Sequence, residues 1–158
     1  MGEGGRRRLP STLTFAVAAA SLAAAPPVTV FRPGHNLCKT ATLSAIREAG
    51  GEHYKAGIFA SGTCIWERPD LAAGITLATH PRTAGLQLMH QFLSQAAMHP
   101  TRVSVPGAES AVLVQTSGRS KDLFALYRGG VVQVNMTAPG GPPVSRLVAV
   151  MRLVAPRA

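Results

Sequence analysis

The sequence is poor in cysteine and in aromatic residues. Its 158 residues include two cysteines, one tryptophan and two tyrosines, and aromatic residues make up 5% of the chain. Two cysteines allow one disulfide at most. Nucleic-acid-binding proteins usually carry clustered basic residues with aromatic residues between them, whereas the basic residues here are scattered along the chain. We therefore expect no nucleic-acid partner.

Acidic residues are also scarce. Seven acidic residues stand against sixteen basic ones, which gives a formal net charge of +9 at pH 7, and Asp70 and Asp122 are the only aspartates. The chain has no Gly-x-Ser-x-Gly motif, and a serine hydrolase would have to draw its acid from this small supply. A diffuse positive charge suits solubility or a loose attraction to anionic envelope polymers. The sequence thus contains no catalytic motif, and we name no catalytic residues.

The histidines do not form a metal-binding pattern. None of the five lies at the short spacing from another that a zinc site on one helix requires: His35, His53, His80, His90 and His99. Glu48, Glu52 and His53 lie close together around a Gly-Gly turn and are either a metal site or, as we favour, solvated loop charges. Gly140-Gly141 lacks the lysine and the helix that follow the glycines of a phosphate-binding loop. We expect no metal and no cofactor.

The N-terminus has the order of a secretory signal peptide. Arg6-Arg7-Arg8 is followed by an apolar run from Leu13 to Ala20 and then by small residues. The apolar run is too short to span a bilayer. Ser21 and Ala23 fit a cleavage site after Ala23, and a basic tail on a cytosolic protein is the alternative. We predict that the protein is exported and is either secreted or associated with the cell envelope. Its predicted parts are a signal peptide at 1–23, a proline-rich lead-in at 24–36 and a single domain at 37–155.

The two cysteines and the tryptophan share one stretch. Cys38 opens a helical pattern, and Cys64 lies in Thr63-Cys64-Ile65-Trp66-Glu67-Arg68, which alternates as a strand does. A Cys38–Cys64 disulfide would tie the helix to the sheet and contribute about 3.5 kcal/mol. Cys64 and Trp66 would share a strand face, so we expect Trp66 to be a structural core residue beside the sulfur. Two reduced, buried thiols are the alternative, and the redox compartment decides between them.

The hydrophobic periodicity predicts an α+β domain. Apolar residues at helical spacing predict three helices. The first begins at Thr40, the second covers Leu86 to Ala97, and the third covers Leu147 to Val154. Strands are predicted by short apolar or alternating runs at Tyr54–Phe59, around Cys64, and at Gly74–Ala78, Ala111–Thr116, Leu123–Tyr127 and Val131–Met136. Gly129-Gly130 is predicted as a hairpin turn. We expect an antiparallel sheet of about five to six strands, in the order helix-strands-helix-strands-helix, covered by helices on one principal face.

Several of these features resemble one known family. The shared features are a helix-opening cysteine (Cys38), Cys64-Ile65-Trp66 on a strand, Val105-Pro106-Gly107-Ala108 before a strand, and a closing helix. Through them the chain resembles exported actinobacterial proteins of domain-of-unknown-function family 3558. Many of these are envelope lipoproteins, and a looser similarity extends to extracellular sensor-type domains of bacterial kinases. The resemblance covers roughly residues 37–154. This chain lacks a lipid-attachment cysteine after its apolar run and a second cysteine pair, and the family implies no catalytic residues.

Three classes of function fit the sequence. The first is a non-enzymatic exported module that binds an unknown envelope ligand or protein partner, most simply as a monomer without a transmembrane helix in the mature chain. The second is an exported enzyme whose site assembles from scattered residues, such as His90 with Glu67 or Asp122. The third is a secreted inhibitor that presents the loop from Thr101 to Ala108 to a protease. We favour the binding module.

Overall fold

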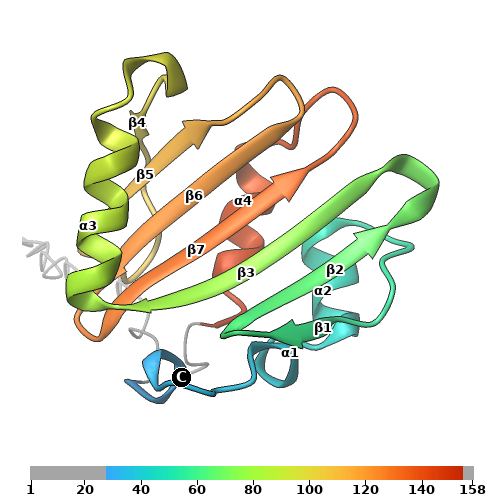
Figure 1. The fold of residues 1–158 in the computed structure, drawn as a ribbon. Helices are drawn as coiled ribbons and strands as arrows, with labels where there is room; N and C mark the ends of the chain where they lie inside the picture. The colour runs from blue at the N-terminus through green and yellow to red at the C-terminus, as the bar shows by residue number, and fades with distance from the viewer. Residues whose placement is uncertain (1–27, 155–158) are drawn as a thin grey trace, which may run out of the picture.

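The computed structural model of the protein describes residues 28–154. They form a seven-stranded antiparallel sheet with helices packed on it (Figure 1), so the predicted α+β class is confirmed. The described strands number seven, one more than the upper prediction. The predicted signal peptide at 1–23, its cleavage site after Ala23, and residue 155 at the predicted end of the domain lie outside the described residues.

The elements follow one another with short connections. The helices are the 3₁₀ helix η1 (Val28–Phe31), α1 (Leu37–Thr40), α2 (Leu43–Gly50), the 3₁₀ helix η2 (Pro69–Leu71), α3 (Arg82–Leu93), the 3₁₀ helix η3 (Ala96–Met98) and α4 (Val144–Met151). The strands are β1 (Ile58–Ala60), β2 (Thr63–Arg68), β3 (Ala73–Pro81), β4 (Thr101–Arg102), β5 (Ser110–Gln115), β6 (Ser120–Tyr127) and β7 (Gly130–Thr137). The predicted order of elements therefore holds only coarsely.

The sheet joins two meanders at its centre. The strand order is β1-β2-β3-β7-β6-β5-β4, so neighbours in sequence are neighbours in the sheet except at the β3–β7 pair. That pair extends from Gly74 opposite Thr137 to Pro81 opposite Gly130. Helix α3 connects the first meander, β1 to β3, with the second, β4 to β7. It begins at Arg82, directly after β3 ends at Pro81.

Helices cover both faces of the sheet, which corrects the prediction of one principal face. In Figure 1, α2 and α4 lie behind the strands, and α3 packs against the opposite face. Strand β6 shows the reason, because Leu123 and Ala125 belong to the core under α4 whereas Phe124 and Leu126 belong to the cluster under α3. Alternate residues of a strand point to opposite faces, so β6 is apolar on both.

The larger core reaches further toward the N-terminus than predicted. Val30 and Phe31 of η1 are buried in it, and the Thr79 hydroxyl donates a hydrogen bond to the carbonyl oxygen of Val30 at 2.8 Å. The packed domain therefore begins before Leu37, within the segment predicted as a proline-rich lead-in.

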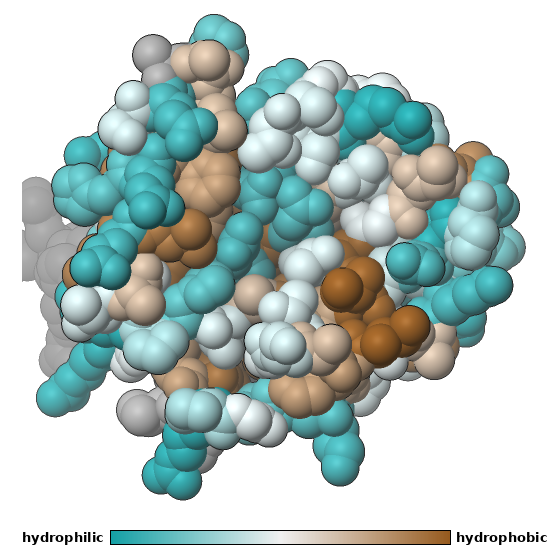
Figure 2. All heavy atoms as spheres, in the orientation of Figure 1, coloured by the Kyte–Doolittle hydropathy of each residue, from teal (hydrophilic) through white to brown (hydrophobic). Residues whose placement is uncertain are grey.

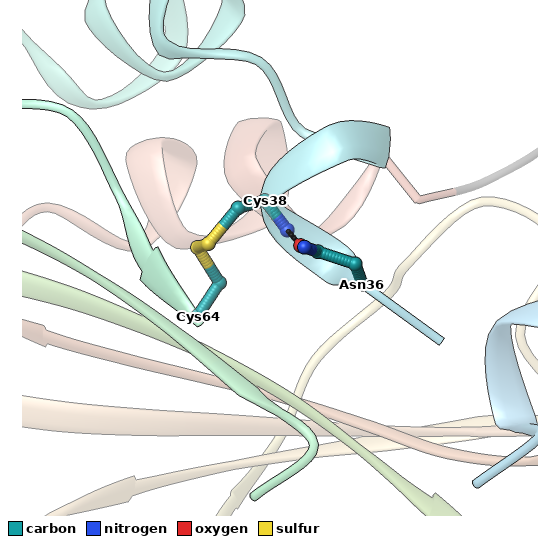
Figure 3. The surroundings of a disulfide bond; sticks show 3 residues. All are labelled: Asn36, Cys38 and Cys64. Atoms are coloured by element: carbon teal, nitrogen blue, oxygen red, sulfur yellow. Dashed lines mark hydrogen bonds between the residues drawn. A yellow bond between two sulfur atoms is a disulfide. The ribbon is translucent and has the colours of Figure 1, made fainter. Parts of the chain in front are cut away.

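The Cys38–Cys64 disulfide is present and ties α1 to β2 (Figure 3), with a Cα–Cα distance of 5.4 Å. Asn36 caps α1, because its Oδ1 accepts a hydrogen bond from the Cys38 amide at 3.0 Å. Trp66 is 1% exposed and lies on the Cys64 face of β2. A Cβ at Gly57 would lie 2.7 Å from the Cys64 sulfur and 2.5 Å from Nε1 of Trp66, so only glycine fits over this pair.

The β6–β7 hairpin corrects the predicted turn. Tyr127 pairs with Gly130, so the two connecting residues are Arg128 and Gly129, and Gly130 is the first residue of β7. Gly129 and Gly130 instead allow the Phe31 side chain to pack closely against the backbone of the hairpin. A Cβ at either position would lie within 2.6 Å of the Phe31 ring, so glycine here makes room for η1.

Candidate binding cleft beside helix α3

A cleft of about 430 Å³ lies between α3 and the β4–β5 edge of the sheet. Its apolar wall is formed by side chains that recur at three- and four-residue spacing on α3, Leu86, Met89 and Leu93, and by Val112 of β5. Its polar lining comes from His90, Arg102, Glu109 and Ser110. The volume lies within the range of about 300–1,000 Å³ that is usual for small-molecule sites. The predicted Leu86–Ala97 helix thus supplies one wall, although α3 itself ends at Leu93.

Helix α3 sits close to the sheet because it packs through a glycine. A Cβ at Gly85 would lie 2.5 Å from both Cβ and Cγ2 of Val131, closer than side-chain atoms approach one another. Met89, one turn further on, is buried in the same cluster as Phe124. The Gly85 contact sets how closely α3 packs against β7.

Glu109, which lines the cleft, is paired with Arg82 of α3. Arg82, at the start of α3, donates to both carboxylate oxygens of Glu109 at 2.9 and 2.8 Å, and also to the Tyr127 carbonyl at 2.8 Å. The hydrogen bond from Arg82 holds the pKa of Glu109 below its usual value, and the same bond raises the pKa of Arg82. The charge of Glu109 is therefore balanced within the cleft wall.

Arg102 lies at the other side of the cleft, on the short edge strand β4. It pairs with Val112 across β4 and β5, so the two side chains share the face that α3 covers. Arg102 is exposed, and no acidic group lies within ion-pair distance of it among residues 28–154. The cleft thus combines an apolar wall with one positive charge that is not balanced by a carboxylate.

The rest of this sheet face is open and polar. Asp122 is 4% exposed, and its two carboxylate oxygens accept hydrogen bonds from the Gln133 amide at 2.9 Å and the Asn135 amide at 2.8 Å. Because Gln133 donates to Asp122, its Oε1 accepts from His80 at 3.0 Å, which places a proton on Nε2 of that ring. These side chains satisfy one another across β3, β7 and β6, so the network has a structural role.

Beyond the polar network, β1 and β2 carry an apolar patch. Ile58 is 65% exposed and lies opposite Ile65 in the sheet register. Figure 2 shows this hydrophobic patch over β1 and β2, separated from α3 by hydrophilic side chains over the middle strands. The patch lies apart from the cleft, since neither Ile58 nor Ile65 lines it.

The residues of the predicted scattered enzyme site are not brought together. His90 lines the cleft from α3, Asp122 is held by amides on the sheet, and Glu67 is exposed on β2. No hydrogen bond or ion pair joins any two of the three within the part of the chain that the structure describes. The arrangement contains no base positioned next to a nucleophile.

The Glu48, Glu52 and His53 group remains a surface feature. These residues line a shallow depression with Arg47, and the His53 ring lies 3.8 Å from a Glu52 oxygen with both side chains largely exposed. In residues 28–154, no three His, Cys, Asp or Glu side chains lie close enough to hold a metal ion.

The loop from Thr101 to Ala108 is held against the domain. Val105, at its centre, is buried in the larger core, and the Val103 amide donates to the Ala111 carbonyl at 3.2 Å. A protease-inhibiting loop must present its central residues to the enzyme, so this packing argues against such a role.

The comparisons with known proteins give no relative. Neither protein-family models, nor curated proteins, nor solved structures match this chain. The likeness to domain-of-unknown-function family 3558 therefore remains a prediction. The cleft beside α3 was not predicted from the sequence, although the helix itself was. The contact between Arg82 and Glu109 joins residues 27 positions apart, and no local pattern in the sequence signals it.

Proposed function

We propose that this chain is a non-enzymatic module of the cell envelope or of the secreted fraction, and that it binds a ligand in the cleft beside α3. The observation that carries the proposal is the cleft itself, whose apolar wall opens to solvent at Leu86 and Leu93 above the buried Met89. Apolar clefts with a few polar groups are the usual form of small-molecule sites. Within the described residues, the charged groups around it are paired or isolated rather than arranged for catalysis.

The disulfide supports the proposal that the protein is exported to the cell envelope or the secreted fraction. Disulfides persist mainly in oxidising compartments, and this one joins the only two cysteines of the chain. None of the helices in residues 28–154 has the length and apolar character needed to cross a membrane. We propose further that the chain belongs with the envelope proteins of family 3558 and acts as a monomer.

Binding of a neutral fluorescent probe tests the proposed site. N-phenyl-1-naphthylamine fluoresces when it leaves water, and we expect saturable binding at one site per chain. Leu93 is 42% exposed and lines the cleft, so Leu93→Glu should leave the fold intact and place a charge on the apolar wall. We expect this variant to lose about tenfold or more in affinity, because burial of a leucine side chain is worth about 1.5–3 kcal/mol.

The matched control is Leu71→Glu. Leu71 is also 42% exposed but lies on η2, outside the cleft, so this substitution introduces the same charge at the same exposure elsewhere. Its probe affinity should equal that of the unmodified protein. Equal loss in both variants, or no saturable binding to the unmodified protein, would overturn the proposed site.

A further inference from the structure

The distribution of charge in the cleft carries information about its ligand. Two ionised side chains line the cleft, Arg102 and Glu109. The Glu109 carboxylate is occupied by two hydrogen bonds from the Arg82 guanidinium, at 2.9 and 2.8 Å. A ligand that enters the cleft therefore meets a neutralised carboxylate at one side.

Among the residues that the structure describes, Arg102 differs from Glu109 in having no charged partner. It makes no ion pair with any residue from 28 to 154, and its side chain stands beside Val112 at the edge of the apolar wall. A guanidinium presents several N–H donors in one plane, which match the oxygens of a carboxylate or a phosphate. One free positive charge next to an apolar surface favours a ligand that is anionic at one end and apolar along the rest.

We infer that the cleft takes a single-chain anionic amphiphile, whose head group is bound by Arg102 and whose chain lies on Leu86, Met89 and Leu93. This inference rests on the proposed function and adds the chemical class of the ligand. The apolar residues lie on successive turns of α3, so they form a continuous strip along the helix. An anion is favoured near Arg102 because the charge of Glu109 is already balanced by Arg82.

Displacement of the neutral probe by two matched competitors tests the inference. Decanoate and decanol, both below the concentration at which they aggregate, share one chain and differ in the charge of the head group. We expect decanoate to bind the unmodified protein about tenfold more tightly than decanol, the size of effect that one charge-assisted hydrogen bond gives. The preference should shrink as salt is added, because salt screens an exposed guanidinium. Decyl phosphate, used in parallel, shows whether a phosphate is preferred to a carboxylate.

Arg102→Gln is the decisive variant. It should bind decanol as the unmodified protein does and lose the preference for decanoate. Arg152→Gln is the matched control, because it removes the same charge from the molecule at a different place. Arg152 is exposed at the C-terminal end of α4, on the other face of the sheet. This control should keep the preference.

The outcomes separate the inference from the proposed function. Equal binding of decanol and decanoate to the unmodified protein would overturn the anionic head group while leaving the cleft a binding site. A preference that survives in Arg102→Gln, or that both arginine variants lose equally, would overturn the role of Arg102. Absence of probe binding to the unmodified protein would overturn both proposals.

Discussion

The two tyrosines of the chain are both buried, and burial controls how they ionise. Desolvation raises the pKa of Tyr127 to about 12, and it also raises the pKa of Tyr54, although Arg68 and Arg146 nearby act in the opposite direction. A phenolate is strongly hydrated, so a side chain that is shielded from water keeps its proton to higher pH.

At pH 10, the usual pKa of tyrosine, we therefore expect less phenolate in the folded protein than in the unfolded chain, and almost none from Tyr127. Because the folded pKa lies above the unfolded one, the stability contributed by these groups is fully present below pH 10. For Tyr127 this stability is lost as the pH rises from about 10 toward 12. Ultraviolet titration of the phenolate band measures this, with the protein in concentrated guanidinium as the reference that titrates normally. A folded-state titration that coincides with the titration in guanidinium would contradict the burial of the two side chains.

Single residues also show where sequence reasoning stops. The partners of the Cys38–Cys64 disulfide were predictable because only two cysteines exist and one pairing is possible, whereas the choice between a disulfide and two reduced thiols depended on the compartment. The roles of Arg102 and Glu109 were not, because both depend on what the sheet and α3 place beside them. Thirteen basic residues outside the predicted signal peptide look alike in sequence, and only the fold separates Arg82, which is paired, from Arg102, which is not.

At the scale of elements, the placement of α3 depends on one missing side chain. Gly85→Ala would force a methyl group against Val131, and overpacking of this kind costs on the order of 1–3 kcal/mol. Alanine also favours a helix over glycine by about 1 kcal/mol, so the net loss should fall toward the lower end. Urea unfolding followed by the fluorescence of Trp66, the only tryptophan, measures it.

Gly118→Ala is the control for this substitution. A Cβ at Gly118 would meet no atom within 4 Å, and its backbone is not in the left-handed region. We expect its free energy of unfolding to stay within about 0.5 kcal/mol of the parent protein. Equal stability of the two variants would show that α3 does not depend on the contact at Gly85.

The elements differed in how well the sequence predicted them. The closing helix was predicted because Leu147, Val150 and Met151 repeat at helical spacing and are all buried. The placement of helices on both faces was missed, although the run from Leu123 to Tyr127 is apolar at every position. Such a run is typical of a strand covered on both sides. Strand β4 was missed because it has two residues, too few to show any period.

The disulfide links two distant parts of the domain. It closes a loop across 26 residues and joins α1 to the sheet, so its reduction should lower the free energy of unfolding by about 3.5 kcal/mol. Unfolding in the presence and absence of dithiothreitol tests this. The control is Cys38→Ser, which has no disulfide to lose and should be insensitive to the reductant. Two titratable thiols in the unreduced, denatured protein would contradict the bond.

The central β3–β7 pair joins a strand that is synthesised early to one that is synthesised late. Strand β3 is complete at Pro81, whereas the last residue that pairs with it from β7 is Thr137. A nascent chain that has been made only through α3 carries β3 as a bare nine-residue edge, and bare strand edges pair with whatever strand they meet. Strand β7 covers this edge late, so a ribosomal pause or a truncation between Leu93 and Gly130 would leave a product whose principal hazard is aggregation.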